Sequence, residues 1–311
     1  MRAFIFPGQG SQAVGMGKAL AEASAAAREV FQEVDDALGR HLSALMFEGP
    51  AEELTLTANA QPAIMANAIA TLRVLEKEGG VKLADKADYV AGHSLGEYTA
   101  LCAAGALDLA TTALLLRHRG EAMQAAVPVG MGSMAALLGA DLALAQKIAE
   151  AAAQGEVCTV ANDNDPSQVV ISGAKAAIDR AIEMAKEMGA KRAIALPVSA
   201  PFHCPMMQPA ADAMAKALAE ARIDSPLVPV FANVTAQPVS DVDTIRKLLV
   251  EQVTGMVRWR ESVINMTDTG VERFVEFGGK VLAPMVKRIV PDVDAGSVIS
   301  MEDIEAVAKS F

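Results

Sequence analysis

Cysteine is scarce in this 311-residue chain, which contains only Cys102, Cys158 and Cys204. The number is odd and no two of the cysteines stand at metal-ligand spacing. These facts exclude a disulfide framework and a cysteine-based metal centre as the organising feature of the fold. We therefore expect a protein of the reducing cytoplasm that holds no metal.

Long hydrophobic runs are also missing. The apolar run at residues 3–6 stops at Pro7-Gly8 and is too short for the core of a signal peptide. The most apolar later stretch, residues 100–116, contains Gly105 and Asp108. We expect neither a secretion signal nor a membrane span, and no internal repeat or low-complexity linker divides the chain.

Positive charge is in deficit, because 27 Lys and Arg residues face 38 Asp and Glu residues, for a net charge of -11. This balance argues against nucleic-acid binding by general electrostatic attraction. Hydrophobic residues make up 52% of the chain and charged residues 21%, which is typical of a globular protein. The length is sufficient for one large domain or two smaller ones.

Short apolar runs alternate with longer helical patterns, which indicates an α/β fold. Residues 3–6 predict a strand that enters a glycine-rich turn, followed by one long alanine-rich helix to about residue 38. A second helix is predicted from about Asn59, with Pro62 in its first turn. Asp108 and Asp141 are expected to cap later helices.

The pattern changes after Pro128. Residues 128–197 predict the order β-α-β-β-α-β, which is the ferredoxin-like arrangement, with a turn at residues 162–166. The chain then returns to an alternating α/β pattern. Strands are expected at residues 228–233 and 273–277, and helices at 241–254, 259–268 and from about 280 to 290. We predict a large domain of residues 1–127 and 198–311 and a small inserted domain of residues 128–197.

The segment Gly92-His93-Ser94-Leu95-Gly96 is a G-x-S-x-G motif. A strand is predicted directly before it and a helix directly after it, which is the context of a nucleophile elbow. The two glycines let neighbouring backbones crowd together at the strained turn. Ser94 is therefore a candidate nucleophile, and an ordinary glycine-rich turn is the alternative.

A serine nucleophile needs a base. Among the four histidines, His203 stands out because it lies in a proline-bounded loop directly after a predicted strand, where α/β enzymes place catalytic groups. His93 belongs to the elbow, where its side chain should point away from the serine Oγ. Cys204 is a rival nucleophile, but it lacks an elbow and is expected to be a buried filler. No acidic residue stands out as a partner that would orient His203, so that role is left open.

Arg119 follows the elbow, on the predicted helix that begins after Asp108. A guanidinium presents a fixed fork of donors that matches a carboxylate, so Arg119 is a candidate for binding an anionic substrate group. From the residue alone, a solvated helix arginine is the more common outcome.

Together these residues resemble a known family. The chain is similar over its whole length to the malonyl-CoA:acyl carrier protein transacylases of fatty-acid synthesis and to the acyl transferase domains of polyketide synthases. The similarity rests on six motifs in order: Phe6-Pro7-Gly8-Gln9-Gly10-Ser11-Gln12, Gly92-His93-Ser94-Leu95-Gly96-Glu97-Tyr98, Arg119-Gly120, Pro201-Phe202-His203, Asn233-Val234 and Gly279-Lys280-Val281-Leu282.

The resemblance implies an α/β-hydrolase-like large domain with a ferredoxin-like insert, and a role for each matched residue. Ser94 would carry the acyl group as an ester, and His203 would act as the base. The backbone N–H groups of Gln9 and Leu95 would form the oxyanion hole, and Arg119 would pair with the malonyl carboxylate. The carbonyl of Gln252 would orient His203.

The resemblance also implies the substrates. Malonyl-CoA would be the donor and acyl carrier protein the acceptor, with coenzyme A entering only as part of the substrate and with no cofactor. Phe202 resembles the malonyl-selecting form of its loop. One departure is Gly278-Gly279, which stands where many relatives have Gly-Pro.

Three alternatives stay open at the level of sequence. The chain could transfer another carboxylated acyl group in a polyketide pathway, hydrolyse esters with the same nucleophile and base, or bind carrier protein without turnover. Because carrier proteins are acidic, a basic docking surface near the cleft is expected, with Lys280, Lys287 and Arg288 as candidates. A solvated helix face explains these three residues equally well.

Overall fold

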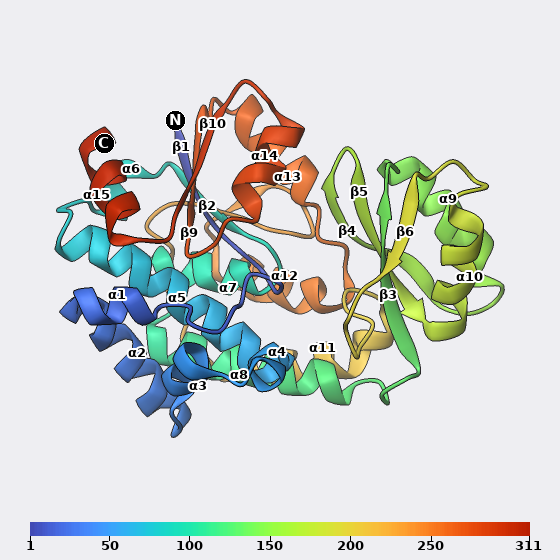
Figure 1. Ribbon diagram of the computed structural model, residues 1–311, viewed down its shortest axis with the longest axis horizontal. Helices are drawn as coiled ribbons and strands as arrows, with labels where there is room; N and C mark the ends of the chain where they lie inside the picture. Colours follow the sequence, from blue (N-terminus) through green and yellow to red (C-terminus); the bar gives the residue numbers. More distant parts are fainter.

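The computed structural model describes all 311 residues and contains two sheets (Figure 1). The larger sheet has the strand order β10-β9-β1-β2-β7-β8, and all its neighbouring pairs are parallel except β7 with β8. Its strands are β1 (Arg2–Phe6), β2 (Tyr89–Gly92), β7 (Val230–Phe231), β8 (Pro238–Val239), β9 (Arg273–Phe277) and β10 (Asp294–Val298). Phe6 and Gly92 are paired at the ends of β1 and β2, so the loops after both strands leave the same edge of the sheet.

Helices cover both faces of this sheet, as expected for parallel strands. Alternate side chains of β1 serve the two sides: Ile5 packs under α13 (Trp259–Asp268) and α14 (Leu282–Ile289), and Phe6 belongs to the larger core on the opposite face. The remaining helices of the large domain contribute to that larger core: α1 (Lys18–Ala23), α2 (Ala25–Leu38), α3 (Leu42–Glu48), α4 (Ala51–Thr55), α5 (Thr57–Lys77), α6 (Leu83–Lys86), α7 (Leu95–Ala103), α8 (Leu109–Ala125), η1 (Pro205–Met207), α11 (Gln208–Glu220), α12 (Val242–Thr254) and α15 (Met301–Ser310). None of the helices has both the length and the hydrophobicity to cross a membrane.

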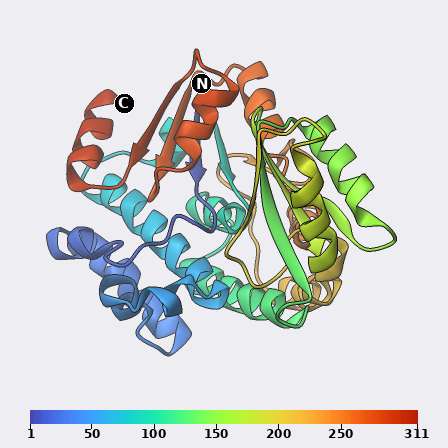
Figure 2. The ribbon, with the colours of Figure 1, turned by 45° about the vertical axis from the view of Figure 1, so that its right-hand side comes forward.

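The second sheet forms a small subdomain with its own core, here defined as residues 132–195 (Figure 2). Its elements are β3 (Gly132–Leu138), α9 (Leu142–Ala153), β4 (Cys158–Asp165), β5 (Gln168–Ala174), α10 (Lys175–Ala185) and β6 (Arg192–Ala195). The strands are antiparallel in the order β4-β5-β3-β6, which confirms the predicted ferredoxin-like arrangement. All these elements fall within residues 128–197, although the predicted domain boundaries themselves stay a prediction.

The two faces of the small sheet have different roles. Helices α9 and α10 cover one face through residues such as Ile148 and Ile178. Met134 and Val170 on the other face pack with Val198 and Phe202, which belong to the segment that returns to the large domain. The uncovered face of the small sheet therefore turns toward the large domain.

The turn predicted at residues 162–166 was wrong, because β4 continues to Asp165. Two contacts with the large domain hold this end of the strand extended. Its backbone bonds with Val257, from Val257 N–H to the Ala161 carbonyl at 2.8 Å and from Asp163 N–H to the Val257 carbonyl at 3.0 Å. The buried carboxylates of Asp163 and Asp165 each meet an arginine of the large domain, at 2.9 Å from Arg260 and 2.7 Å from Arg288.

Local polar contacts explain the other differences from the sequence-based expectations. The helix expected to run unbroken to residue 38 is two helices, because extended Ser24 separates them and caps the second by accepting the Ala27 N–H. The strand expected at residues 228–233 shrinks to two residues. Asn233, the last residue of the expected strand, lies outside β7. Its backbone N–H donates to Glu97 Oε2 and its side-chain Nδ2 donates to the Gly92 carbonyl. The helix expected from Asn59 begins at Thr57, which places Pro62 inside the helix instead of in its first turn. The helix caps predicted at Asp108 and Asp141 are confirmed.

Candidate functional site

Ser94 lies on a strained turn between β2 and α7. Its backbone has φ 55° and ψ −111°, a conformation that non-glycine residues adopt only when the surroundings enforce it. The Ser94 N–H donates to Asn233 Oδ1 at 2.8 Å, which helps to fix the turn. A Cβ on Gly92 would lie 1.9 Å from the Gly96 carbonyl carbon, and one on Gly96 would lie 2.3 Å from the Phe6 carbonyl oxygen. The elbow therefore requires glycine at both motif positions, as the sequence predicted.

His203 contacts Ser94 through one ring nitrogen and the backbone through the other. Ser94 Oγ is 2.7 Å from His203 Nε2, and His203 Nδ1 is 2.8 Å from the Gln252 carbonyl oxygen. Because a carbonyl only accepts hydrogen bonds, Nδ1 carries the proton and Nε2 presents its lone pair to the serine hydroxyl. The group that orients the histidine is thus a backbone carbonyl, at the position that the resemblance implied.

The surroundings of His203 favour its neutral form. Burial, together with the positive charge of Arg119, lowers the pKa of His203 to about 3, while the hydrogen bond to Gln252 opposes the shift. A base whose pKa is about 3 is unprotonated throughout the physiological range. His203 is therefore ready to accept the proton of Ser94.

This shift predicts an unusual pH dependence. The rate of Ser94 acylation should stay nearly level as the pH falls from 8 to 5, because His203 remains neutral until the pH approaches 3. A histidine with an ordinary pKa of about 6.5 would lose most of the rate over the same range. Quenched-flow mixing with an acyl-CoA donor, followed by intact-protein mass spectrometry, measures this profile.

Glu97 provides the control for that experiment. Burial raises the pKa of Glu97 to about 7, so this carboxyl titrates within the same window. A Glu97→Gln variant removes that titration and leaves the profile of His203 alone. A decline centred near pH 6.5 in both proteins would contradict a depressed pKa for His203.

Gln9 and Leu95, the two residues expected to supply oxyanion-hole N–H groups, line the same cavity as Ser94. Leu95 is the first residue of α7, where the helix dipole adds to the N–H. Gln9 lies in the loop after β1, and that loop approaches the elbow so closely that a Cβ on Gly8 would lie 2.7 Å from the His93 carbonyl oxygen. The N–H groups of Gln9 and Leu95 make no hydrogen bond within the chain, so both are free to stabilise negative charge on a substrate oxygen.

Arg119 is buried, with 1% of its surface exposed, and has no carboxylate partner. Its Nη1 donates to Gln61 Oε1 at 2.7 Å, and its Nη2 donates to Gln252 Oε1 at 2.7 Å and to Ser94 Oγ at 3.1 Å. Its Nε has no hydrogen-bond partner. All its hydrogen-bond acceptors are neutral, so no carboxylate pairs directly with the positive charge beside the nucleophile.

Close helix packing brings Arg119 to this position. A Cβ on Gly120 would lie 2.6 Å from the Ala58 Cα, which means that α8 and the start of α5 touch backbone to backbone. The guanidinium carbon also lies 5.6 Å from the centre of the Tyr98 ring, within the range of a cation–π contact. Arg119 is thus a buried site residue rather than a solvated helix arginine.

A buried polar network behind the site was not predicted from the sequence. Gln252 Nε2 donates to Glu97 Oε2 at 2.7 Å and to the Ser94 carbonyl at 3.0 Å. Glu97 Oε2 also accepts the Asn233 N–H at 3.2 Å. Glu97 and Asn233 stand in motifs that the resemblance quoted, but nothing in the sequence indicated that Gln252 would connect them. Gln252 supports both His203, through its backbone, and Arg119, through its side chain.

Ser94 opens into a cavity of about 260 Å³ between the two domains. Arg119 and Gln61 supply its polar wall, and Met123, Met134 and Phe202 supply apolar surface. A neighbouring hollow of about 340 Å³ also has Gln9 and Phe202 in its lining. The two hollows share Gln9 and Phe202 in their walls, and we call the pair of hollows the cleft.

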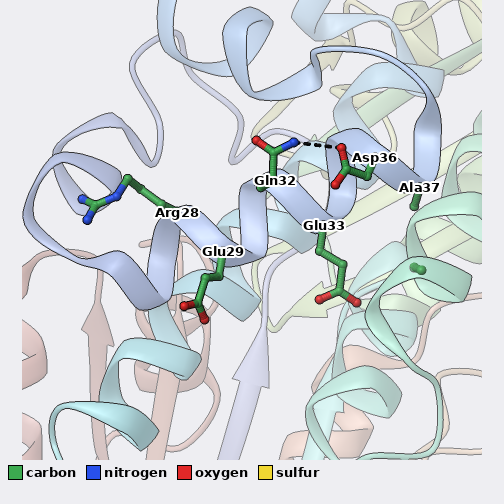
Figure 3. Close-up of a pocket in the computed structure, with 7 residues that line it drawn as sticks. Arg28, Glu29, Gln32, Glu33, Asp36 and Ala37 are labelled. Atoms are coloured by element: carbon green, nitrogen blue, oxygen red, sulfur yellow. Dashed lines mark hydrogen bonds between the residues drawn. The ribbon is translucent and has the colours of Figure 1, made fainter.

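A wider hollow of about 620 Å³ lies on the surface of α2 (Figure 3). Its lining is mostly charged, and Arg28, Gln32 and Glu33 point in different directions, with Gln32 bonded to Asp36. It contains no nucleophile with an adjacent base. The chemistry is therefore concentrated at Ser94.

The remaining candidates take supporting positions. His93 Nε2 is 2.8 Å from Asn164 Oδ1 on β4, so its ring is held by the small subdomain. Cys204 is fully buried, burial raises the pKa of its thiol, and Sγ donates to the Pro201 carbonyl. These features leave the thiol a poor nucleophile.

The three basic docking candidates differ in their surroundings. Arg288 donates to buried Asp165, and Lys287 donates to the carbonyls of Pro291 and Val293. Lys280 is exposed and makes no hydrogen bond. Only Lys280 presents its charge without a partner from the chain itself.

Comparison of the sequence with known proteins identifies the family of the chain. A profile described as "Acyl transferase domain" matches residues 3–286. The chain belongs to the acyl transferase family. This acyl transferase is 47% identical to the malonyl CoA-acyl carrier protein transacylase of Bacillus subtilis, over 99% of the present chain and 96% of the relative.

Solved structures agree with the family assignment. The acyl-carrier-protein-S-malonyltransferase of Bartonella henselae has 54% identity and a TM-score of 0.97, with 99% of this acyl transferase and 98% of that chain covered. A malonyl-transacylase solved in complex with a type II polyketide synthase acyl-carrier protein has 40% identity and a TM-score of 0.96, with 100% and 99% covered. These matches confirm the α/β-hydrolase-like architecture with a ferredoxin-like insert.

Proposed function

We propose that this acyl transferase moves a malonyl group from malonyl-CoA to the phosphopantetheine thiol of acyl carrier protein. The observation that carries the proposal is the unmatched guanidinium of Arg119, whose Nη2 lies 3.1 Å from Ser94 Oγ. In a malonyl thioester one CH₂ separates the reacting carbonyl from the free carboxylate. A cation this close to the nucleophile can reach that carboxylate while the carbonyl lies at Ser94.

In the first step, Ser94 Oγ attacks the thioester carbonyl while His203 Nε2 takes the hydroxyl proton. The negative charge that develops on the carbonyl oxygen is stabilised by the N–H groups of Gln9 and Leu95, an effect worth about 2.7–4 kcal/mol for one such donor. The bond from carbon to sulfur then breaks, and His203 returns its proton to the departing coenzyme A sulfur. The product is a malonyl ester on Ser94.

The second step runs the same chemistry with a different thiol. His203 takes the proton of the phosphopantetheine thiol, and the sulfur attacks the malonyl ester. The same two N–H groups stabilise the second tetrahedral intermediate. Its collapse breaks the ester bond while His203 returns the proton to Ser94 Oγ, which gives malonyl carrier protein and free Ser94. His203 serves both thiols because its tautomer is fixed by Gln252.

The walls of the cleft support selection of a malonyl group. Met123, Met134 and Phe202 limit the space around the acyl chain, and Arg119 supplies the only cation in the lining of the cavity. We propose that no cofactor takes part, with coenzyme A entering only as part of the donor. The three free cysteines support a location in the reducing cytoplasm. We propose that the transfer serves fatty-acid synthesis.

Intact-protein mass spectrometry tests the proposal. The protein is mixed briefly with malonyl-CoA or acetyl-CoA, and peptide mapping then locates the label. We expect rapid malonyl labelling on Ser94, much slower acetyl labelling, and loss of the malonyl label when acyl carrier protein bearing phosphopantetheine is added. Equal labelling by both donors would contradict malonyl selectivity. Rapid loss of the label into water, without acceptor, would identify a hydrolase.

A further inference from the structure

A chain of hydrogen bonds joins the carboxylate-binding arginine to the oxyanion loop. Arg119 Nη1 donates to Gln61 Oε1 at 2.7 Å, and Gln61 Nε2 donates to Thr57 Oγ1 at 2.9 Å. Thr57 Oγ1 in turn donates to Gln9 Oε1 at 2.9 Å. The chain passes through the first two turns of α5 and ends on the side chain of Gln9, which lines the same cavity as Ser94.

The direction of every bond in this chain is fixed by Arg119. A guanidinium only donates, so the oxygen of Gln61 must face it and the NH₂ group of Gln61 must face Thr57. The Thr57 oxygen accepts that bond, which leaves its single proton for Gln9. The amide of Gln9 therefore turns its oxygen toward α5.

The burial of the members makes this path well defined. Thr57 is 4% exposed and Gln61 is 1% exposed, so water does not readily replace their partners. Gln9 is exposed and lines both hollows of the cleft. The other side-chain bonds of its loop, from Ser11 to the Gly8 carbonyl and from Gly10 N–H to Gln12, stay within the loop. The bond to Thr57 is the one side-chain hydrogen bond that ties Gln9 to the body of the protein.

We propose that Thr57 is a positioning residue whose hydroxyl holds Gln9 so that the Gln9 N–H faces the reacting carbonyl oxygen. Through Gln61, the same hydroxyl also couples the position of Gln9 to that of Arg119. This inference rests on the roles proposed above for Gln9 and Arg119. Thr57 lies buried in the wall of the 340 Å³ hollow, and in this proposal it acts through the side chains of Gln9 and Gln61. The hydroxyl, rather than the volume of the side chain, carries the effect.

Single-turnover acylation of Ser94 by malonyl-CoA tests the inference with four variants. Thr57→Val keeps the volume but lacks the hydroxyl, and we expect the limiting acylation rate to fall about tenfold. Loss of a whole oxyanion donor lowers rates by about 10²–10³-fold, and a displaced donor should cost less. Thr57→Ser keeps the hydroxyl and should stay within about twofold of wild type. The malonyl-CoA concentration that gives half the limiting rate should change little, which separates positioning from binding.

Gln9→Ala and the double variant Thr57→Val/Gln9→Ala complete a double-mutant cycle. Gln9→Ala removes the same bond from its other end while keeping the backbone N–H, at an exposed position where folding is not at risk. Its rate should fall by no more than that of Thr57→Val, which also loses the bond from Gln61, and the double variant should be no slower than Thr57→Val, because all three lack the bond between Thr57 and Gln9. A roughly hundredfold loss in the double variant, or a rate within twofold of wild type for either single variant, would overturn the inference.

The same experiment separates failure of this inference from failure of the proposed function. Wild-type protein that takes no malonyl label on Ser94 would contradict the proposed function and this inference with it. Labelled wild type with an equally fast Thr57→Val variant would contradict only the role of Thr57.

Discussion

Replacing Ser94 with alanine is expected to lower malonyl transfer to carrier protein by at least about 10⁴-fold, the scale seen when a hydrolase loses its nucleophile. The variant keeps His203, the two N–H donors and the cleft, but it lacks the oxygen that forms the ester. The transfer rate is measured with malonyl-CoA and carrier protein, and the acyl-enzyme by mass spectrometry. Both signals should vanish together.

Cys204→Ala is the matched control for this prediction. Cys204 is adjacent to His203, fully buried and free, so it is the thiol that could replace the serine as nucleophile. We expect Cys204→Ala to keep the malonyl label at nearly the wild-type rate. A label that survives in Ser94→Ala and disappears in Cys204→Ala would show that the thiol, rather than the elbow serine, is the nucleophile.

Replacing Arg119 with alanine is expected to lower the preference for malonyl-CoA over acetyl-CoA about ten- to a hundredfold. A hydrogen bond to a charged group is worth about 1.5–3 kcal/mol, and this range sets the size of the loss. The effect should fall on malonyl labelling, because the acetyl group offers no carboxylate to the guanidinium. The ratio of the two acylation rates is the measured quantity.

Arg117→Ala provides the comparison on the same helix. Arg117 also carries one positive charge, but it is paired with Glu121 near the surface, at 2.5 Å from Nε to Oε1. Its loss should leave the ratio of malonyl to acetyl labelling unchanged. If Arg119→Ala lowered both labelling rates by the same factor, Arg119 would support the structure of the site rather than recognise the carboxylate.

The sequence predicted those parts of the site that depend on local pattern. The elbow follows from two glycines around a serine between a strand and a helix, and the β-α-β-β-α-β order follows from periodicity alone. The role of Gln252 came only from the family resemblance, because a backbone carbonyl has no signature in the residue type.

The network around Glu97, Gln61 and Thr57 could not be predicted for a different reason. Its bonds join residues far apart in the chain: Gln252 and Glu97 are separated by 155 positions, and Thr57 and Gln9 by 48. In a sequence that predicts a helix, polar residues that will be buried cannot be distinguished from exposed ones. Only the packing of the helices decides which of them face one another. The same reason explains why the pattern around Asp163 and Asp165 predicts a turn, since their arginine partners lie about a hundred residues later.

Those two aspartates also limit how the protein can be recombined. Residues 128–197 look like a separable module, and exchanging them between relatives is an obvious way to alter the cleft. Placed in a relative that lacks arginines at the positions of Arg260 and Arg288, the insert would carry two buried carboxylates without their counter-charges. A workable chimera must therefore inherit residues 257–288 together with the insert, so the unit of inheritance is discontinuous in the chain.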